Sequence, residues 1–161
     1  MTTPADLRWL SPTALHAGGP RGLVKATERT LWNLGFEDVR VIDGSGDRGA
    51  DILAVRGHEE WVIQAKWSSS GPVDSDGVNE VNHAFEHYRA DKAVLVTNTY
   101  VSLPAQRRAD ALRGIGLDLT IWNGATLAAI GAHMPDKVEG RHQPREYQTE
   151  AVEEIEADLL Q

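Results

Sequence analysis

The chain has 161 residues, of which 41% are hydrophobic and 25% are charged, so it is long enough to bury one compact core. No run of 18 apolar residues is long enough to cross a membrane, and the first residues lack the pattern of a secretory signal. The absence of cysteine excludes disulfides, thiolate zinc sites and a cysteine nucleophile. We therefore expect a cytoplasmic protein.

The net charge of −8 is unevenly distributed along the chain. Residues 146–161 carry six acidic residues and no Lys or Arg, so residues 1–145 have a net charge of only −2. Nucleic-acid binding favours basic surfaces. The charge therefore does not indicate a nucleic-acid partner, but the uneven distribution means that it does not exclude one.

Hydrophobic periodicity predicts alternating helices and strands after residue 20. A helix is expected over residues 22–34, ended by Gly35, and then a strand over 39–42 and a glycine-rich turn over 43–49. Strands over 51–56 and 61–67 flank a turn and indicate a hairpin. The later elements are a helix over 77–89, a strand over 93–97, a helix over 104–113, a strand over 117–122 and a helix over 125–132.

This order predicts an α/β fold with a mixed sheet, in which antiparallel strands join strands that are reached by helical crossovers. The strand over residues 93–97 (AVLVT) is almost wholly apolar, as expected when helices cover both faces of the sheet. We expect residues 1–20 to be an N-terminal extension and residues 21–134 to form the main domain.

The predicted hairpin places three polar residues on one face. If its loop closes symmetrically, Arg56 pairs with Trp61, and Asp51 then lies opposite Lys66. Gln64 shares that face because it is two residues from Lys66. One carboxylate, one amide and one lysine therefore converge on one side of an otherwise apolar hairpin.

These residue types suit metal-assisted hydrolysis of a phosphodiester. The negative charge of a phosphodiester repels nucleophiles, and a divalent metal neutralises that charge and activates water. Magnesium prefers oxygen ligands and keeps several waters, so Asp51 and the Gln64 amide oxygen are suitable donors. The ammonium of Lys66 would orient the attacking water or offset charge in the transition state.

The sequence GDRGADI at residues 46–52, followed one hairpin later by Gln64-Ala65-Lys66, resembles the Mrr-like restriction endonucleases of the PD-(D/E)XK nuclease superfamily. The resemblance extends over residues 22–130 and includes the VTN sequence at 96–98. It implies a restriction-endonuclease-like core and magnesium- or manganese-dependent DNA cleavage, leaving 5′-phosphate and 3′-hydroxyl ends. It also implies a dimer of the chain for double-strand cleavage.

The resemblance assigns roles to individual residues. It implies that Asp51 and Gln64 bind the metal with the carbonyl of Ala65, and that Lys66 is the catalytic lysine. The family usually adds a glutamate from the first helix. Glu28 is the only glutamate there, although the family's usual spacing from the helix-ending glycine points nearer to position 24, one helical turn away on the same face.

A second resemblance lies in the tail. Residues 143–152 (QPREYQTEAV) resemble the opening of a superfamily 2 helicase core, after an expected linker over residues 135–144. We therefore expect residues 145–161 to begin a truncated helicase-like domain, and the chain to be the nuclease module of a nuclease–helicase restriction or defence enzyme. If this tail instead defines the function, the alternative is an ATP-driven helicase. The chain has no GxxxxGK[ST] phosphate-binding loop, which such an enzyme needs.

Two other interpretations stay open at this point. The first is a non-catalytic DNA-binding or docking module that keeps the nuclease fold without cleavage. The second is a zinc site, in which His83 and His87, one helical turn apart, bind the metal with Glu80 or Glu86. A third ligand at a characteristic spacing is missing, which favours a solvated helix face for these residues.

Overall fold

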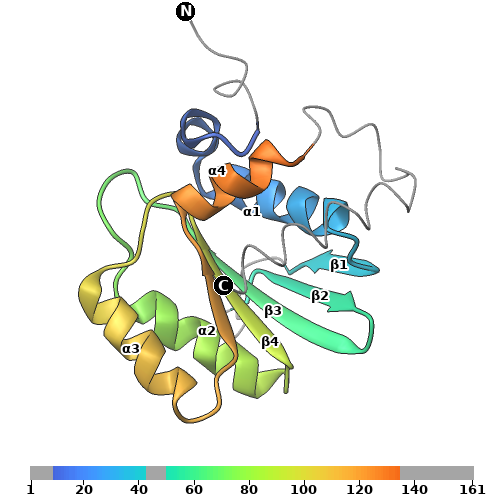
Figure 1. Cartoon of the computed structure of the whole chain (residues 1–161), viewed down its shortest axis with the longest axis vertical. Helices are drawn as coiled ribbons and strands as arrows, with labels where there is room; N and C mark the ends of the chain where they lie inside the picture. Colours follow the sequence, from blue (N-terminus) through green and yellow to red (C-terminus); the bar gives the residue numbers. More distant parts are fainter. Residues whose placement is uncertain (1–8, 43–49, 135–161) are drawn as a thin grey trace, which may run out of the picture.

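The computed structural model describes residues 9–42 and 50–134, which form a five-stranded sheet between two layers of helices (Figure 1). In chain order the elements are α1 (Pro12–Asn33), β1 (Asp38–Val41), β2 (Ile52–Arg56), β3 (Glu59–Lys66), α2 (Ser75–His87), β4 (Lys92–Thr97), α3 (Leu103–Arg113), β5 (Leu119–Trp122) and α4 (Gly124–Ala132). Each predicted helix and strand over this part of the chain is present, with bounds that differ by a few residues except at the start of α1.

The strands lie in the order β1-β2-β3-β4-β5. β1, β2 and β3 pair antiparallel, whereas β3, β4 and β5 pair parallel because helices α2 and α3 carry the chain back to the same edge before each new strand. The predicted α/β fold with a mixed sheet is confirmed. None of the helices described here is long and apolar enough to span a membrane.

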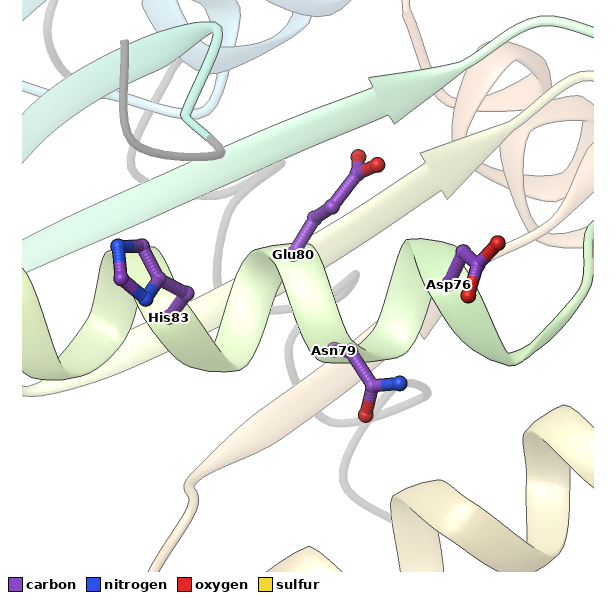
Figure 2. Close-up of a pocket in the computed structure, with 4 residues that line it drawn as sticks. All are labelled: Asp76, Asn79, Glu80 and His83. Atoms are coloured by element: carbon purple, nitrogen blue, oxygen red, sulfur yellow. The ribbon is translucent and has the colours of Figure 1, made fainter. Parts of the chain in front are cut away.

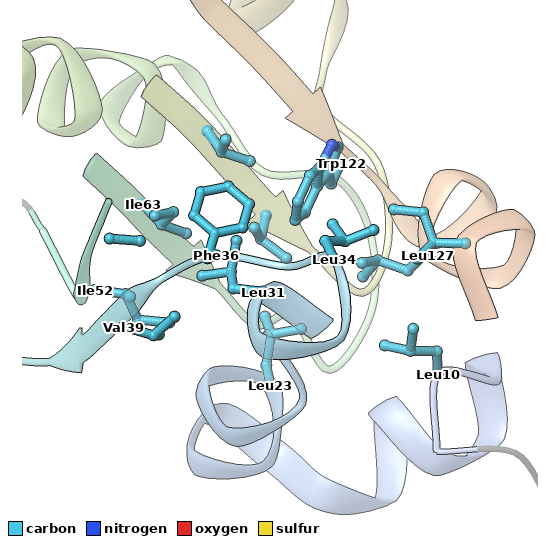
Figure 3. Close-up of a cluster of buried hydrophobic side chains, with 14 of the residues drawn as sticks. Leu10, Leu23, Leu31, Leu34, Phe36, Val39, Ile52, Ile63, Trp122 and Leu127 are labelled. Carbon is cyan, nitrogen blue, oxygen red and sulfur yellow. The ribbon is translucent and has the colours of Figure 1, made fainter. Parts of the chain in front are cut away.

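Two buried clusters cover the two faces of the sheet. The α1-side cluster packs α1 and α4 on one face (Figure 3), and it consists of Leu10, Leu15, Leu23, Leu31, Leu34, Phe36, Val39, Ile52, Ala54, Ile63, Val94, Val96, Trp122, Leu127, Ile130 and Met134. The α2-side cluster packs α2 and α3 on the other face, and it consists of Ala50, Val62, Val73, Val78, Val81, Ala84, Ala90, Ala93, Leu95, Val101, Ala105, Ala109, Leu112, Leu117 and Leu119. β4 contributes alternate residues to both clusters, so the predicted cover on both faces is confirmed.

Helix α1 begins ten residues before the predicted start. Ser11 caps it by accepting a hydrogen bond from the Ala14 backbone N–H at 3.1 Å. Gly19 and Pro20 kink this helix without ending it, because Gly19 adopts a φ of 69° and Pro20 begins the next helical segment. Leu10 and Leu15 are 1% and 2% exposed, so the segment expected to be an extension contributes to the core.

The register of the β2–β3 hairpin differs from the predicted one by two residues. Arg56 pairs with Glu59, not with Trp61, since the turn contains only Gly57 and His58. Gly57 has a φ of 63°, which suits the first position of a two-residue hairpin turn that begins with glycine. A shift of two residues preserves the face of every side chain, whereas a shift of one would reverse it.

Three predicted segments lie outside the described residues. These are the glycine-rich turn at 43–49, the linker at 135–144 and the helicase-like segment from 145 to 161. The helicase association therefore stays a prediction from sequence.

The burial of Leu10 predicts that residues before the kink stabilise the domain. Leu10→Ala should lower the free energy of unfolding by about 2–5 kcal/mol, as for other buried leucines. Leu103→Ala is the matched control, because Leu103 is 64% exposed and its truncation should cost less than about 0.5 kcal/mol. Urea unfolding measures both variants, and equal losses would show that Leu10 is not part of the core.

Candidate active site

Strand alternation places Gln64 and Lys66 on the α2 side of the sheet. Leu53 of β2 and Val62 of β3 pair with each other and pack in or against the α2-side cluster. Gln64 and Lys66 follow Val62 by two and four residues within β3, so both share that face. Asp51 stands just outside β2, and the alternation of that strand does not extend to it, because its N–H donates toward β3 while its carbonyl accepts from Ile42. With the observed register, position 51 falls opposite Gln64 instead of the predicted Lys66.

Asp51 lies just before β2, beside the end of β3. Its Oδ2 accepts a hydrogen bond from the Ala65 backbone N–H at 2.8 Å, and its own N–H donates to the Ile63 carbonyl at 2.8 Å. Within a strand, the N–H and C=O of one residue point to the same side. The Ala65 carbonyl is therefore directed to the side on which the Asp51 carboxylate lies.

The amide of Gln64 is buried, and only one of its two polar ends has a hydrogen-bond partner in the described structure. The residue is 7% exposed, and its Nε2 donates to Glu80 Oε2 at 3.3 Å. Its Oε1 is buried and has no hydrogen-bond partner within the described part of the chain. A buried acceptor without a partner is uncommon, and it is the kind of group that a bound cation or water would satisfy.

Lys66 forms an ion pair with the same carboxylate. Its Nζ contacts Glu80 Oε2, and the side chains of Lys66 and Glu80 are 33% and 41% exposed. In Figure 2, Glu80 points from α2 toward the strands, whereas Asn79 points away from them. An open pocket of about 280 Å³ lies along this part of α2 and is lined by Asp76, Asn79, Glu80 and His83. The lysine is therefore paired but still accessible.

Two local features hold the end of β3 against its neighbours. A Cβ at Gly77 of α2 would lie 2.9 Å from Val73 Cγ1, which is too close, so glycine permits the helix to pack against Val73; Lys66 Cγ is 3.4 Å from the same point. Asn98, just after β4, accepts from the Ser68 N–H at 2.8 Å and donates to the Ser68 carbonyl at 2.8 Å. The Asn98 contacts hold the backbone just after Lys66.

From the sequence, Glu80 was considered only as a zinc ligand, and its contacts with Gln64 and Lys66 were not predicted. Its position carried a signal. Glu80 is three residues after Gly77 and four before Ala84, both of which are buried, so it lies at the edge of the apolar face of α2. An acid at the edge of the buried face of a helix can reach a partner on the element beneath it.

The structure does not bring Glu28 together with the other three predicted site residues. Glu28 lies on α1, which packs against the opposite face of the sheet, and no hydrogen bond or ion pair joins it to Asp51, Gln64 or Lys66 in the described structure. Its role stays a prediction.

The alternative zinc site is not formed. The rings of His83 and His87 stack with centroids 6.4 Å apart. Across residues 9–42 and 50–134, no three His, Cys, Asp or Glu side chains are grouped in a way that could hold a metal. A cation at this site would therefore depend on mixed donors: the Asp51 carboxylate, the Gln64 amide oxygen and the Ala65 carbonyl. Such a neutral and anionic oxygen set fits magnesium, which retains water for its remaining positions.

The sheet order, the two helical layers and the polar trio at the end of the hairpin define a restriction-endonuclease-like domain. The Mrr_cat restriction endonuclease family matches residues 15–130, well over half of the chain, and the chain belongs to this family. A comparison with curated proteins gave no match.

Two solved structures share the fold. One is the DNA modification-dependent restriction endonuclease AspBHI, with a TM-score of 0.61 and 15% sequence identity, covering 98% of this chain and 41% of that one. The other is AF1548, a protein of unknown function, with a TM-score of 0.51 and 14% identity, covering 85% of this chain and 97% of that one. This chain thus corresponds in length to less than half of AspBHI.

The hydrogen bond from Ala65 to Asp51 predicts a difference between two substitutions. Asp51→Asn keeps an oxygen that accepts from the Ala65 N–H, so the free energy of unfolding should stay within about 0.5 kcal/mol of the parent. Asp51→Ala leaves this N–H without its acceptor and should cost about 1–3 kcal/mol. Denaturant unfolding in the presence of EDTA measures both, and an equal loss in the two variants would contradict the structural role of this bond.

Proposed function

We propose that the chain is a metal-dependent endonuclease that hydrolyses DNA phosphodiester bonds at Asp51, Gln64 and Lys66, with magnesium or manganese as cofactor. The observation that carries this proposal is the buried amide oxygen of Gln64, which has no hydrogen-bond partner among the described residues. It lies two residues before Lys66 and next to Ala65, whose N–H binds the Asp51 carboxylate. Membership of a restriction endonuclease family supports DNA as the substrate.

Each residue contributes a distinct property to this chemistry. The Asp51 carboxylate, the Gln64 amide oxygen and the Ala65 carbonyl would hold the divalent ion, which when bound supplies charge neutralisation and an activated water. The Ala65 N–H holds the Asp51 carboxylate in place from the adjacent strand. Lys66, one-third exposed, presents an ammonium that stabilises negative charge on the phosphate during attack.

The wider assembly is also part of the proposal. We propose that the chain is the nuclease module of a nuclease–helicase restriction enzyme, and that two copies act together on double-stranded DNA. The first part is supported by the sequence of residues 143–152 and the second by the resemblance to Mrr-like endonucleases. Glu28 is carried as a further candidate ligand.

Incubation with supercoiled plasmid tests the cleavage activity directly. Mg²⁺ or Mn²⁺ should give nicked or linear product, and EDTA should abolish it. Asp51→Asn and Lys66→Ala should each lower the rate by on the order of 100-fold or more, because the first removes the charged ligand proposed to hold the metal and the second removes the ammonium that stabilises the anionic transition state. Glu28→Gln is run beside them: a similar loss assigns Glu28 to the site, and an unchanged rate removes it.

Binding of a labelled duplex in Ca²⁺ separates the enzyme from a non-catalytic DNA-binding module. Asp51→Asn should still bind DNA while failing to cleave it. Two outcomes would contradict the catalytic proposal. One is cleavage by Asp51→Asn at the rate of the parent protein. The other is a parent protein that binds DNA but shows no metal-dependent cleavage, which would favour the binding module.

A further inference from the structure

We infer that Glu80 of α2 is a positioning residue that sets the orientation of the Gln64 amide and holds Lys66 beside it; this inference rests on the proposed metal-dependent function. Glu80 itself is assigned no contact with substrate or metal. Its carboxylate acts on two site residues from a different element of the fold.

The first step concerns the two ends of the amide. Glutamine carries an oxygen that only accepts hydrogen bonds and a nitrogen that only donates them, and an ionised carboxylate only accepts. The Gln64 Nε2 must therefore face Glu80, as it does at 3.3 Å. Rotation of the amide by half a turn would place two acceptors against each other, so Glu80 directs Oε1 away from itself and leaves it free to bind a cation.

The second step concerns Lys66. Its Nζ contacts Glu80 Oε2, the same oxygen that accepts from Gln64. Gln64 and Lys66 are two residues apart on one strand, so one carboxylate oxygen from α2 bridges two neighbouring side chains of β3. The lysine is held next to the amide without a direct bond between the two.

The third step concerns how Glu80 reaches the strand. Gly77 lies one helical turn before Glu80, and the point where its Cβ would stand is 3.4 Å from Lys66 Cγ, so this part of α2 lies directly over Lys66. Asp76 lines the same open pocket but makes no ion pair with Lys66 or hydrogen bond with Gln64 in the structure as described. Asp76 is thus a charged residue close to Glu80 on the same helix that lacks the proposed role, and it serves as the control.

The test compares Glu80→Gln with Asp76→Asn in the full chain. Both remove one negative charge from the same part of α2, but only Glu80→Gln replaces the obligatory acceptor by an amide that can both donate and accept. Loss of a residue that orients a metal ligand typically lowers metal affinity 10- to 100-fold. We expect that loss in Mn²⁺ affinity for Glu80→Gln, measured by isothermal titration calorimetry, and less than a threefold change for Asp76→Asn.

A second comparison distinguishes orientation from general structural support. In a Gln64→Glu background the two carboxylate oxygens at position 64 are equivalent, so no orientation is needed. Adding Glu80→Gln should then cause no further loss of Mn²⁺ affinity. If Glu80 only supports the fold, the loss is the same in both backgrounds and the inference is wrong.

NMR of the Gln64 side-chain amide supplies a readout that requires neither metal nor activity. Its resonances should move in Glu80→Gln and stay in place in Asp76→Asn. Equal Mn²⁺ affinities in Glu80→Gln and Asp76→Asn, together with a parent protein that binds Mn²⁺ and cleaves DNA, would overturn the role of Glu80 but not the proposed function. A parent that neither binds Mn²⁺ nor cleaves DNA would overturn the proposed function, and the role toward the metal with it.

Discussion

The candidate site depends on the alternation of side chains along β3, which is paired on both edges and covered on both faces. Val62, Gln64 and Lys66 point to the same helix layer, and their exposure rises along the strand from 1% for Val62 to 7% for Gln64 and to 33% for the Lys66 side chain. The helical cover therefore thins toward the carboxyl end of the strand. Apolar contact anchors its beginning, and polar groups are accessible at its end, where the proposed function places the phosphodiester.

The oxygen of Gln64, which has no hydrogen-bond partner in the part of the chain that the structure describes, has an energetic consequence. A buried acceptor without a hydrogen bond costs about 1–3 kcal/mol. Such a cost is retained where the free acceptor serves binding, because a partner supplied by the protein would compete with the ligand. Glu80 satisfies the donor end of the same amide, so the cost is confined to the one atom that the proposed function uses.

Much of this arrangement follows from sequence, and the parts that do not have physical reasons. The period of two in a strand places Gln64 and Lys66 on one face even though the predicted register was wrong by two residues, because face depends only on parity. The position of the Asp51 carboxylate does not follow from that period, since Asp51 lies outside β2. The length of the hairpin turn depended on the backbone of Gly57, which alternation does not reveal. The early start of α1 was not predicted, because the burial of Leu15 is a tertiary property. The contacts of Glu80 were not predicted, because they depend on how α2 is rotated over β3.

Gly77 shows how this site responds to residues that carry no chemistry. The missing side chain at that position leaves room for Val73, which a Cβ would approach to 2.9 Å, and the carboxylate one turn later reaches two neighbouring side chains of β3. The seating of α2 beside Val73 thus bears on the geometry of the candidate site. A related chain that carried a bulkier residue at this point would have to move α2 or Val73, and the acid one turn later would move with the helix.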